Sequence, residues 1–249
     1  MLYPCKRTCR ILGMAAECQN PNEPIIRNFS GLYRTLGPVS SKATDERRPD
    51  APEGGAKCKI TIMFCDIRGF SRIAEDFPAD ALILLLNEHF TAMTESLAEH
   101  QGALDKCFGD EFVGVFASSE SLQEAALRCI RAALAMQARN YFLNHSRRRK
   151  KLPVFSLGIG INSGTAIAGY VGSPWLKELT VVGDAVNTAQ RLCSIAKPGQ
   201  ILAGDTTYKL VESAVNAEAI GPVMLRGKAK VSRPYEIRSI QQEKMLMCE

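Results

Sequence analysis

Two acidic residues stand where strand-like segments end, and they are the first candidates for chemistry. Asp66 directly follows the apolar, β-branched run 59–65, and Asp110 lies at the predicted turn of a hairpin within 104–116. Hard cations such as Mg²⁺ and Mn²⁺ bind few carboxylates and leave positions for phosphate oxygens and water. Two such ions held by two carboxylates suit in-line displacement at phosphorus. The pair of acids therefore indicates phosphoryl chemistry, provided that the fold brings them together.

The elements that must position these acids follow from the spacing of apolar residues. In chain order we predict a strand at 59–65, a helix at 80–98, the hairpin 104–116, a helix at 121–141, and strands at 154–162 and 165–170. The order β-α-β-β-α-β is that of the ferredoxin-like unit, an antiparallel sheet with helices on one face. A helix at 184–196 and a strand at 235–238 follow. The fold class predicted is α+β, a ferredoxin-like βαββαβ palm core with additional C-terminal strands and helices.

Length and composition indicate one domain with flanking segments. The chain has 249 residues, of which 46% are hydrophobic and 23% charged, enough for one core. Residues 1–57 are rich in Pro, Gly, Ser and charge without sustained periodicity, so they are predicted to be a poorly ordered leader or linker. We expect the catalytic domain at 58–240 and a short tail at 241–249.

Charge and cysteine content limit the partners and the compartment. No run approaches the roughly 18 to 20 apolar residues that span a bilayer, so no membrane span is expected. The net charge of +5 is compatible with an anionic small molecule and does not call for nucleic acid. The basic run 147–151 is interpreted as a solvated connecting loop. Nine cysteines, an odd number with several in apolar runs, favour reduced thiols and a soluble, cytoplasmic protein.

Three ordered motifs support a resemblance to a known family. They are FCDIRGFS at 64–71, KCFGD at 106–110 and TVVGDAVNTAQR at 180–191. In sequence and order they resemble class III adenylyl and guanylyl cyclases, over roughly residues 57–237. Three motifs with matching intervening elements are far more specific than a single glycine-rich loop.

The resemblance implies a role for each matching position around the triphosphate. Asp66 and Asp110 would hold two Mg²⁺ or Mn²⁺ ions, with the Ile67 carbonyl as a further ligand. The backbone that opens the first helix, including Phe70 and Ser71, would offer N–H groups to the phosphates, as helix N-termini do.

Further positions would bind the ribose, the reacting phosphate and the triphosphate. Asn187 and Arg191 lie four apart on one helical face, so both could reach one ligand. The resemblance implies that Asn187 orients the ribose and that Arg191 stabilises charge developing at the α-phosphate. Lys228 matches the lysine that contacts the triphosphate; alternatively it is a solvated loop residue.

Base selection in the family depends on two positions, which here are Lys106 and Thr180. Lysine only donates hydrogen bonds and threonine can donate or accept, so the pair could recognise the adenine edge. The resemblance thus implies an adenylate cyclase that converts ATP to 3′,5′-cyclic AMP and pyrophosphate by attack of the ribose 3′-oxygen on the α-phosphorus. Thr180 is similar to the subgroup associated with bicarbonate, which becomes a candidate regulator.

The resemblance also implies a symmetric homodimer, because the family takes the metal-binding acids from one subunit and the remaining site residues from the other. The segment 170–179, with Trp175, matches the family's dimerisation arm; a core or loop tryptophan is the alternative. Other functions stay open: a guanylyl cyclase, a diguanylate cyclase suggested by FGDEF at 108–112, or a catalytically silent nucleotide-binding and dimerisation module.

Overall fold

The computed structural model describes residues 55–173, 175–227 and 231–241. Its strands are β1 (Gly55–Ile67), β2 (Ala103–Phe108), β3 (Glu111–Phe116), β4 (Leu157–Ser173), β5 (Leu176–Val182), β6 (Ile201–Ala203), β7 (Val215–Ala219) and β8 (Tyr235–Ile240). Its helices are α2 (Phe70–Asp76), α3 (Ala79–Glu99), α4 (Leu122–Arg149), α5 (Asp184–Ile195) and α6 (Asp205–Val211), followed by the 3₁₀ turn η2 (Glu212–Ala214). These described strands form one sheet in the order β2-β3-β1-β4-β6-β8-β7, with β5 paired to β4.

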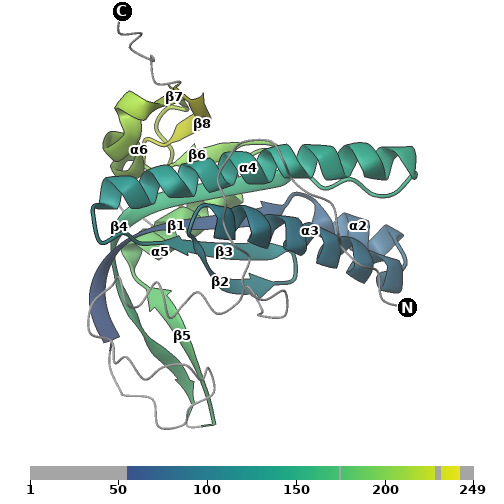
Figure 1. The fold of residues 1–249 in the computed structure, drawn as a ribbon, viewed down its shortest axis with the longest axis horizontal. Helices are drawn as coiled ribbons and strands as arrows, with labels where there is room; N and C mark the ends of the chain where they lie inside the picture. The colour runs from purple at the N-terminus through teal and green to yellow at the C-terminus, as the bar shows by residue number, and fades with distance from the viewer. Residues whose placement is uncertain (1–54, 174, 228–230, 242–249) are drawn as a thin grey trace, which may run out of the picture.

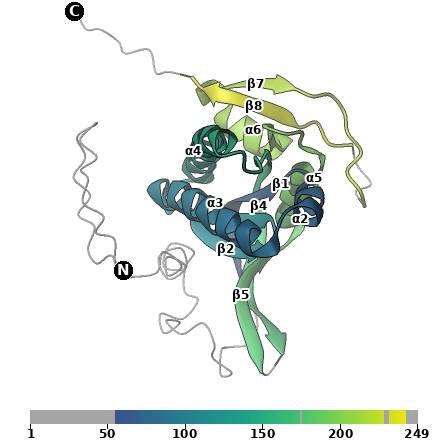
Figure 2. The ribbon, with the colours of Figure 1, turned by 90° about the vertical axis from the view of Figure 1, so that its right-hand side faces the viewer.

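The predicted α+β core is confirmed. The elements β1, α3, β2, β3, α4 and β4 follow one another in the expected order, and β1 pairs antiparallel with both β3 and β4 at the centre of the sheet. Helices α3 and α4 lie on one face of the sheet, and α5 covers the other (Figures 1 and 2). From Ile60 onward, both faces of β1 are consequently buried. Met63 and Cys65 pack in the core beneath α3 and α4, whereas Ile62 and Phe64 pack in the core beneath α5.

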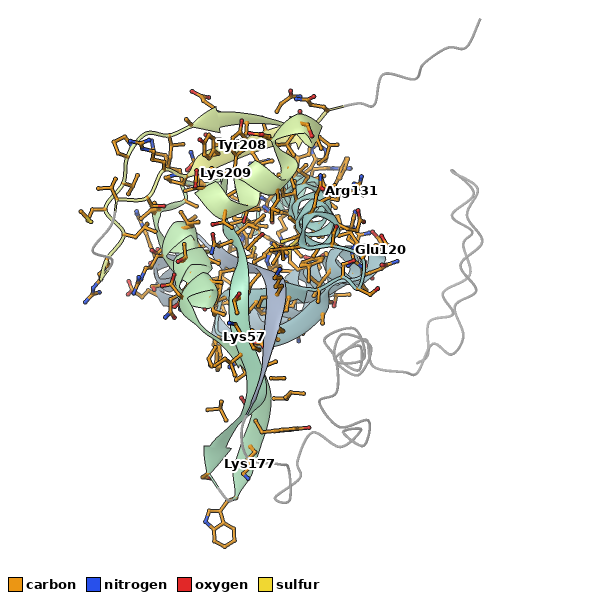
Figure 3. All side chains as sticks on the ribbon, turned by 90° about the vertical axis from the view of Figure 1, so that its left-hand side faces the viewer. Lys57, Glu120, Arg131, Lys177, Tyr208 and Lys209 are labelled. Carbon is orange, nitrogen blue, oxygen red and sulfur yellow. The ribbon has the colours of Figure 1, made fainter. Side chains whose placement is uncertain are left out.

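The strands predicted at 154–162 and 165–170 are one strand, β4, and the predicted break between them is wrong. The polar residues at the expected break are buried and hydrogen-bonded within the fold. Ser163 Oγ lies 2.8 Å from Thr61 Oγ1, and Asn162 Nδ2 donates to Ala185 O at 3.3 Å. Beyond the body of the sheet, β4 and β5 continue as a two-stranded ribbon. Figure 3 shows Lys177 far out along this ribbon, at the opposite end of the molecule from Lys209 on α6.

The interpretation of 147–151 as a solvated loop is wrong for residues 147–149, because α4 extends to Arg149; Lys150 and Lys151 form the exposed turn that follows. Arg147 is buried, and its Nη2 donates to Leu85 O at 2.9 Å and to Glu88 Oε2 at 2.9 Å. Its guanidinium also lies 4.3 Å from the centroid of the Phe155 ring. Guanidinium is weakly hydrated and binds carboxylates and aromatic faces well, so these contacts offset part of the cost of burying the charge.

The first and last strands that the structure describes are β1 and β8. β1 begins at Gly55, slightly before the start predicted at residue 58, and β8 ends at Ile240. Most of the predicted leader and tail, residues 1–54 and 242–249, lies outside the described residues. Among the helices that the structure describes, none is both long and apolar enough to cross a bilayer.

Candidate active site

Three carboxylates gather where β1 ends. Asp66 is paired in register with Glu111 at the start of β3, and Asp110 occupies the preceding turn, next to Gly109 at φ 56°. Burial is the largest cause that raises the pKa of all three carboxyls. Repulsion from Asp110 raises the pKa of Asp66 further, and repulsion from both aspartates raises that of Glu111. The fold therefore concentrates negative charge at this edge of the sheet.

Arg68 offsets part of this charge. Its Nη2 lies 2.8 Å from Asp66 Oδ1 and also donates to Cys193 Sγ at 3.4 Å. Its Nη1 contacts Ser194 O at 3.5 Å. Arg68 therefore connects the end of β1 with the C-terminal part of α5, and it lowers the pKa of Asp66 against the effect of burial.

The donor set fits divalent cations that are shared with a substrate. Partly buried carboxylates that raise one another's pKa are stabilised by a neighbouring cation. Within the described part of the chain, no three His, Cys, Asp or Glu residues converge closely enough to hold an ion unaided. Asp66 and Asp110 would then hold the metal together with oxygens from a triphosphate, which is how Mg²⁺ is usually bound. The Ile67 carbonyl adjoins this point as the last residue of β1.

A cavity of about 450 Å³ opens beside these acids. Its lining residues are Asp66, Glu111, Gln190, Arg191, Cys193, Ser194, Arg226 and Gly227. Arg191 and Gln190 come from α5, and Gln190 hydrogen-bonds the Glu111 carboxylate. Asn187, one turn earlier on the same helix, is exposed to solvent. The cavity thus combines acids, two guanidinium groups and an amide, which can bind a phosphorylated ligand with its metal.

The first turn of α2 lies next to the acidic group. Gly69 precedes the helix with φ 70°, a left-handed conformation that favours glycine, and no side chain caps the first N–H groups. These groups can therefore bind an anion. The Phe70 ring packs edge-on against Phe155 with centroids 6.5 Å apart, and its backbone N–H is among the first of the helix. Ser71 is exposed.

Lys106 and Thr180 lie close together, although they come from β2 and β5. The β4–β5 ribbon returns across the sheet face, where Val181 packs in one cluster with Ala103 and Val113. Thr180 Oγ1 donates to Asp105 Oδ2 at 3.2 Å, and Lys106 Nζ lies 3.9 Å from the same oxygen. One buried carboxylate thus contacts both residues.

Two acids of the site, Glu111 and Asp105, are not among the residues predicted from the sequence. Each directly neighbours a candidate, Asp110 or Lys106, and an acid beside a motif residue is the signal that could have singled it out. Their roles depend on partners in other strands, which only the register of the sheet reveals.

The predictions for Lys228 and Trp175 remain to be compared with the structure. Lys228 lies outside the described residues, while the preceding Arg226 and Gly227 line the cavity. Trp175, between β4 and β5, is 95% exposed, which excludes the core position from the alternatives for this residue.

Comparison with known proteins identifies the class. Residues 55–238 match the family described as the adenylate and guanylate cyclase catalytic domain, and the chain belongs to this family. It is 32% identical over 189–190 residues to a terminal-differentiation-specific adenylate cyclase of Dictyostelium discoideum and to an uncharacterised protein of Mycobacterium tuberculosis. These matches cover 74% of this chain and 9% and 31% of those proteins, so the chain spans about a third or less of their length.

Solved structures of both base specificities resemble the fold. The adenylyl cyclase CyaB of P. aeruginosa has a TM-score of 0.73 at 26% identity, covering 76% of this chain and 98% of that one. The guanylyl cyclase Cya2 has a TM-score of 0.72 at 28% identity, covering 77% and 98%. Because both kinds of cyclase match equally well, the choice of base must be argued from this chain's own residues.

Proposed function

We propose that this chain is an adenylate cyclase that converts ATP to 3′,5′-cyclic AMP and pyrophosphate. The observation that supports ATP as the substrate is that Lys106 and Thr180 both contact the Asp105 carboxylate. The Watson–Crick edge of adenine presents an acceptor at N1 and an amino donor at C6, which a lysine donor and a hydroxyl acceptor complement. Guanine presents the reverse pattern on this edge, an N1–H donor and an O6 acceptor.

In the proposed reaction the ribose 3′-oxygen attacks the α-phosphorus, and the bond from that phosphorus to the bridging oxygen of the β-phosphate breaks. Pyrophosphate leaves, and the hydroxyl proton passes to solvent. Asn187 orients the ribose, and Arg191 stabilises the charge that develops on the α-phosphate. The first N–H groups of α2 and Lys228 bind the remaining phosphates. Two Mg²⁺ or Mn²⁺ ions held by Asp66 and Asp110, with the Ile67 carbonyl, would supply positive charge at the triphosphate.

A homodimer is part of the proposal. Besides Trp175, the β4–β5 ribbon exposes Ile167, Val171 and Val182, and an aromatic anchor with aliphatic neighbours suits a protein interface. In a shared site, Asp66 of one chain acts with Arg191 of the other. Asp66 and Arg191 of the same chain also line one cavity, so the alternative is a site completed within a single chain.

Complementation separates these arrangements. Asp66→Ala and Arg191→Ala chains, each inactive alone, are mixed and allowed to exchange subunits. Half of the dimers are mixed, and each of these has one intact site if the site is shared, so about a quarter of wild-type activity returns. If each chain completes its own site, no activity returns.

The experiment that tests the reaction is product identification. The purified chain is incubated with Mn²⁺ and either ATP or GTP, and the product is identified by mass. We expect cyclic AMP from ATP, abolished by Asp66→Ala and retained by Asp76→Ala, which changes an exposed acid at the end of α2. Wild-type chain that produces no cyclic nucleotide would contradict the proposal.

One observation favours a second candidate, the catalytically silent module. The ion pair between Arg68 and Asp66 occupies an oxygen that the proposed metal requires. A demonstrated dimer that binds ATP without forming product would support this candidate.

Two parts of the proposal concern regulation and location. Bicarbonate is proposed as a regulator because of the threonine at position 180, and its addition at fixed pH should raise turnover. The five cysteines that the structure describes are all free thiols, which supports a reducing compartment, and we place the protein in the cytoplasm.

A further inference from the structure

Asp105 is a buried carboxylate that has no part in the proposed phosphate chemistry. Its side chain is 4% exposed, and Oδ1 is buried without a hydrogen-bond partner among the described residues. Burial raises the pKa of Asp105 to about 6, against the lowering effects of Lys106 and of the hydrogen bond from Thr180. A buried acid with one unpartnered oxygen destabilises a fold, so its presence between two base-selecting residues needs an explanation.

Asp105 lies at an irregularity in the backbone of β2. The β2–β3 register shifts between Leu104 and Lys106, which makes Asp105 the extra residue of a bulge. Consecutive side chains of a regular strand point to opposite faces, and a bulge changes that direction. As a result Asp105 and Lys106 lie within reach of each other and of the same ribbon strand.

The hydrogen bond between Thr180 and Asp105 has a direction, because an ionised carboxylate can only accept. The hydroxyl of Thr180 has one proton, and at 3.2 Å that proton is directed to Asp105 Oδ2. What Thr180 can then present to a base is its lone pairs. A threonine without this partner could instead donate to guanine O6.

We propose that Asp105 is a specificity-determining positioning residue, which fixes Thr180 as a hydrogen-bond acceptor beside the donor Lys106 so that the pair accepts adenine and rejects guanine. This inference rests on the proposed adenylate cyclase function. Asp105 acts through Thr180 and does not touch the base.

The test measures kcat/KM for ATP and for GTP in the full chain. Asp105→Ala should lower the ATP-to-GTP ratio about tenfold, the equivalent of one hydrogen bond, mainly through better use of GTP. In a Thr180→Val background, where there is no hydroxyl to orient, Asp105→Ala should lower the ratio no further. Glu178→Gln is the matched control: it removes a neighbouring charge that raises the Asp105 pKa, and at a pH well above 6, where Asp105 is ionised in both chains, it should leave the ratio at the wild-type value.

The wild-type chain provides a second measurement that does not depend on whether Asp105→Ala folds. The charged groups that face Asp105 are Lys106 on its own strand and Glu178 on β5. Below about pH 6 the protonated carboxyl becomes a donor, Thr180 is released to donate, and the ATP-to-GTP ratio should fall. Titration of the triphosphate cancels in this ratio, because both nucleotides have the same triphosphate.

Three results would overturn the inference. One is an unchanged ratio in a folded Asp105→Ala variant. The second is an equal fall in the Thr180→Val background, which would mean a general structural effect. The third is a wild-type ratio that does not change with pH through about 6. In each case the wild-type chain still forms cyclic AMP, whereas absence of any cyclic product contradicts the proposed function itself.

Discussion

The contact between β4 and α5 at Gly160 supports a sharp prediction about how the site is held. A Cβ atom at position 160 would lie 2.1 Å from Cys193 N and 2.3 Å from Ala189 O. Both are backbone atoms of α5, so no side-chain rotation can relieve the overlap. Since ordinary contact begins at 3.4 Å, Gly160→Ala should displace the helix by about 1 Å.

The displacement has two expected consequences. Forcing a methyl group into a closely packed interface costs roughly 1–3 kcal/mol, so the free energy of unfolding should fall by about that amount. Helix α5 also positions Asn187 and Arg191, and a displacement of about 1 Å in catalytic geometry can cost on the order of 100-fold in rate. Gly160→Ala should therefore lose far more turnover than its moderate loss of stability suggests.

Urea denaturation and cyclic AMP formation measure the two effects on one preparation. Gly114→Ala is the matched control, because its Cβ would overlap only a side-chain atom, Leu97 Cδ1 at 2.7 Å, while Met63 Cε at 3.4 Å and Phe112 Cε1 at 3.7 Å lie at ordinary contact distance. We expect this variant to stay within about 1 kcal/mol of wild type and to keep its turnover. A Gly160→Ala chain with wild-type stability and turnover would refute the argument that close β4–α5 packing sets the site.

Three further predictions concern the core, the ribbon and a buried acid. Arg147→Ala should lower the free energy of unfolding in urea by about 3 kcal/mol, because it removes a buried guanidinium that is paired with Glu88 and stacked on the Phe155 ring. Arg148→Ala, on the exposed side of the same helix, should have little effect, and equal effects of the two substitutions would contradict this prediction. Trp175→Ser should raise the dimer dissociation constant at least about tenfold in sedimentation without changing the circular dichroism, and unchanged dimerisation would remove Trp175 from the interface. The folded state binds a proton at Asp105 more tightly than the unfolded chain does, so ionisation of Asp105 lowers the free energy of unfolding as pH rises from 3.8 to about 6. Asp105→Asn should remove this part of the pH dependence. Identical plots of unfolding free energy against pH for the variant and the wild type would contradict the burial of Asp105.

The main elements of the core could be predicted from the sequence because their apolar residues recur with a clear period. Apolar residues at helical spacing predicted α3 and α4, and the β-branched run ending at Asp66 predicted β1. The predictions from sequence are wrong where the fold satisfies the hydrogen bonds of polar residues internally. Ser163 lies in the gap predicted between two strands and Arg147 in the predicted loop, yet each finds its partners in distant segments of the chain. Such partners cannot be read from local composition.

Some residues of the candidate site could be predicted from the sequence and others could not. Motif residues such as Asp66 and Asp110 could be named from sequence, because they are of chemically reactive types at recognisable positions. Glu111 and Asp105 could not, since their significance depends on the β1–β3 register and on the return of the β4–β5 ribbon. Long-range pairing of this kind is a property of the folded sheet.

A competition assay tests the central claim most directly. Equal concentrations of ATP and GTP are supplied to the full chain with Mn²⁺, and the two cyclic products are quantified together by mass, so that their ratio reports the relative kcat/KM values. The account predicts that cyclic AMP exceeds cyclic GMP by at least about tenfold, because Lys106 and Thr180 complement the adenine edge. Equal amounts, an excess of cyclic GMP, or no cyclic product would contradict it.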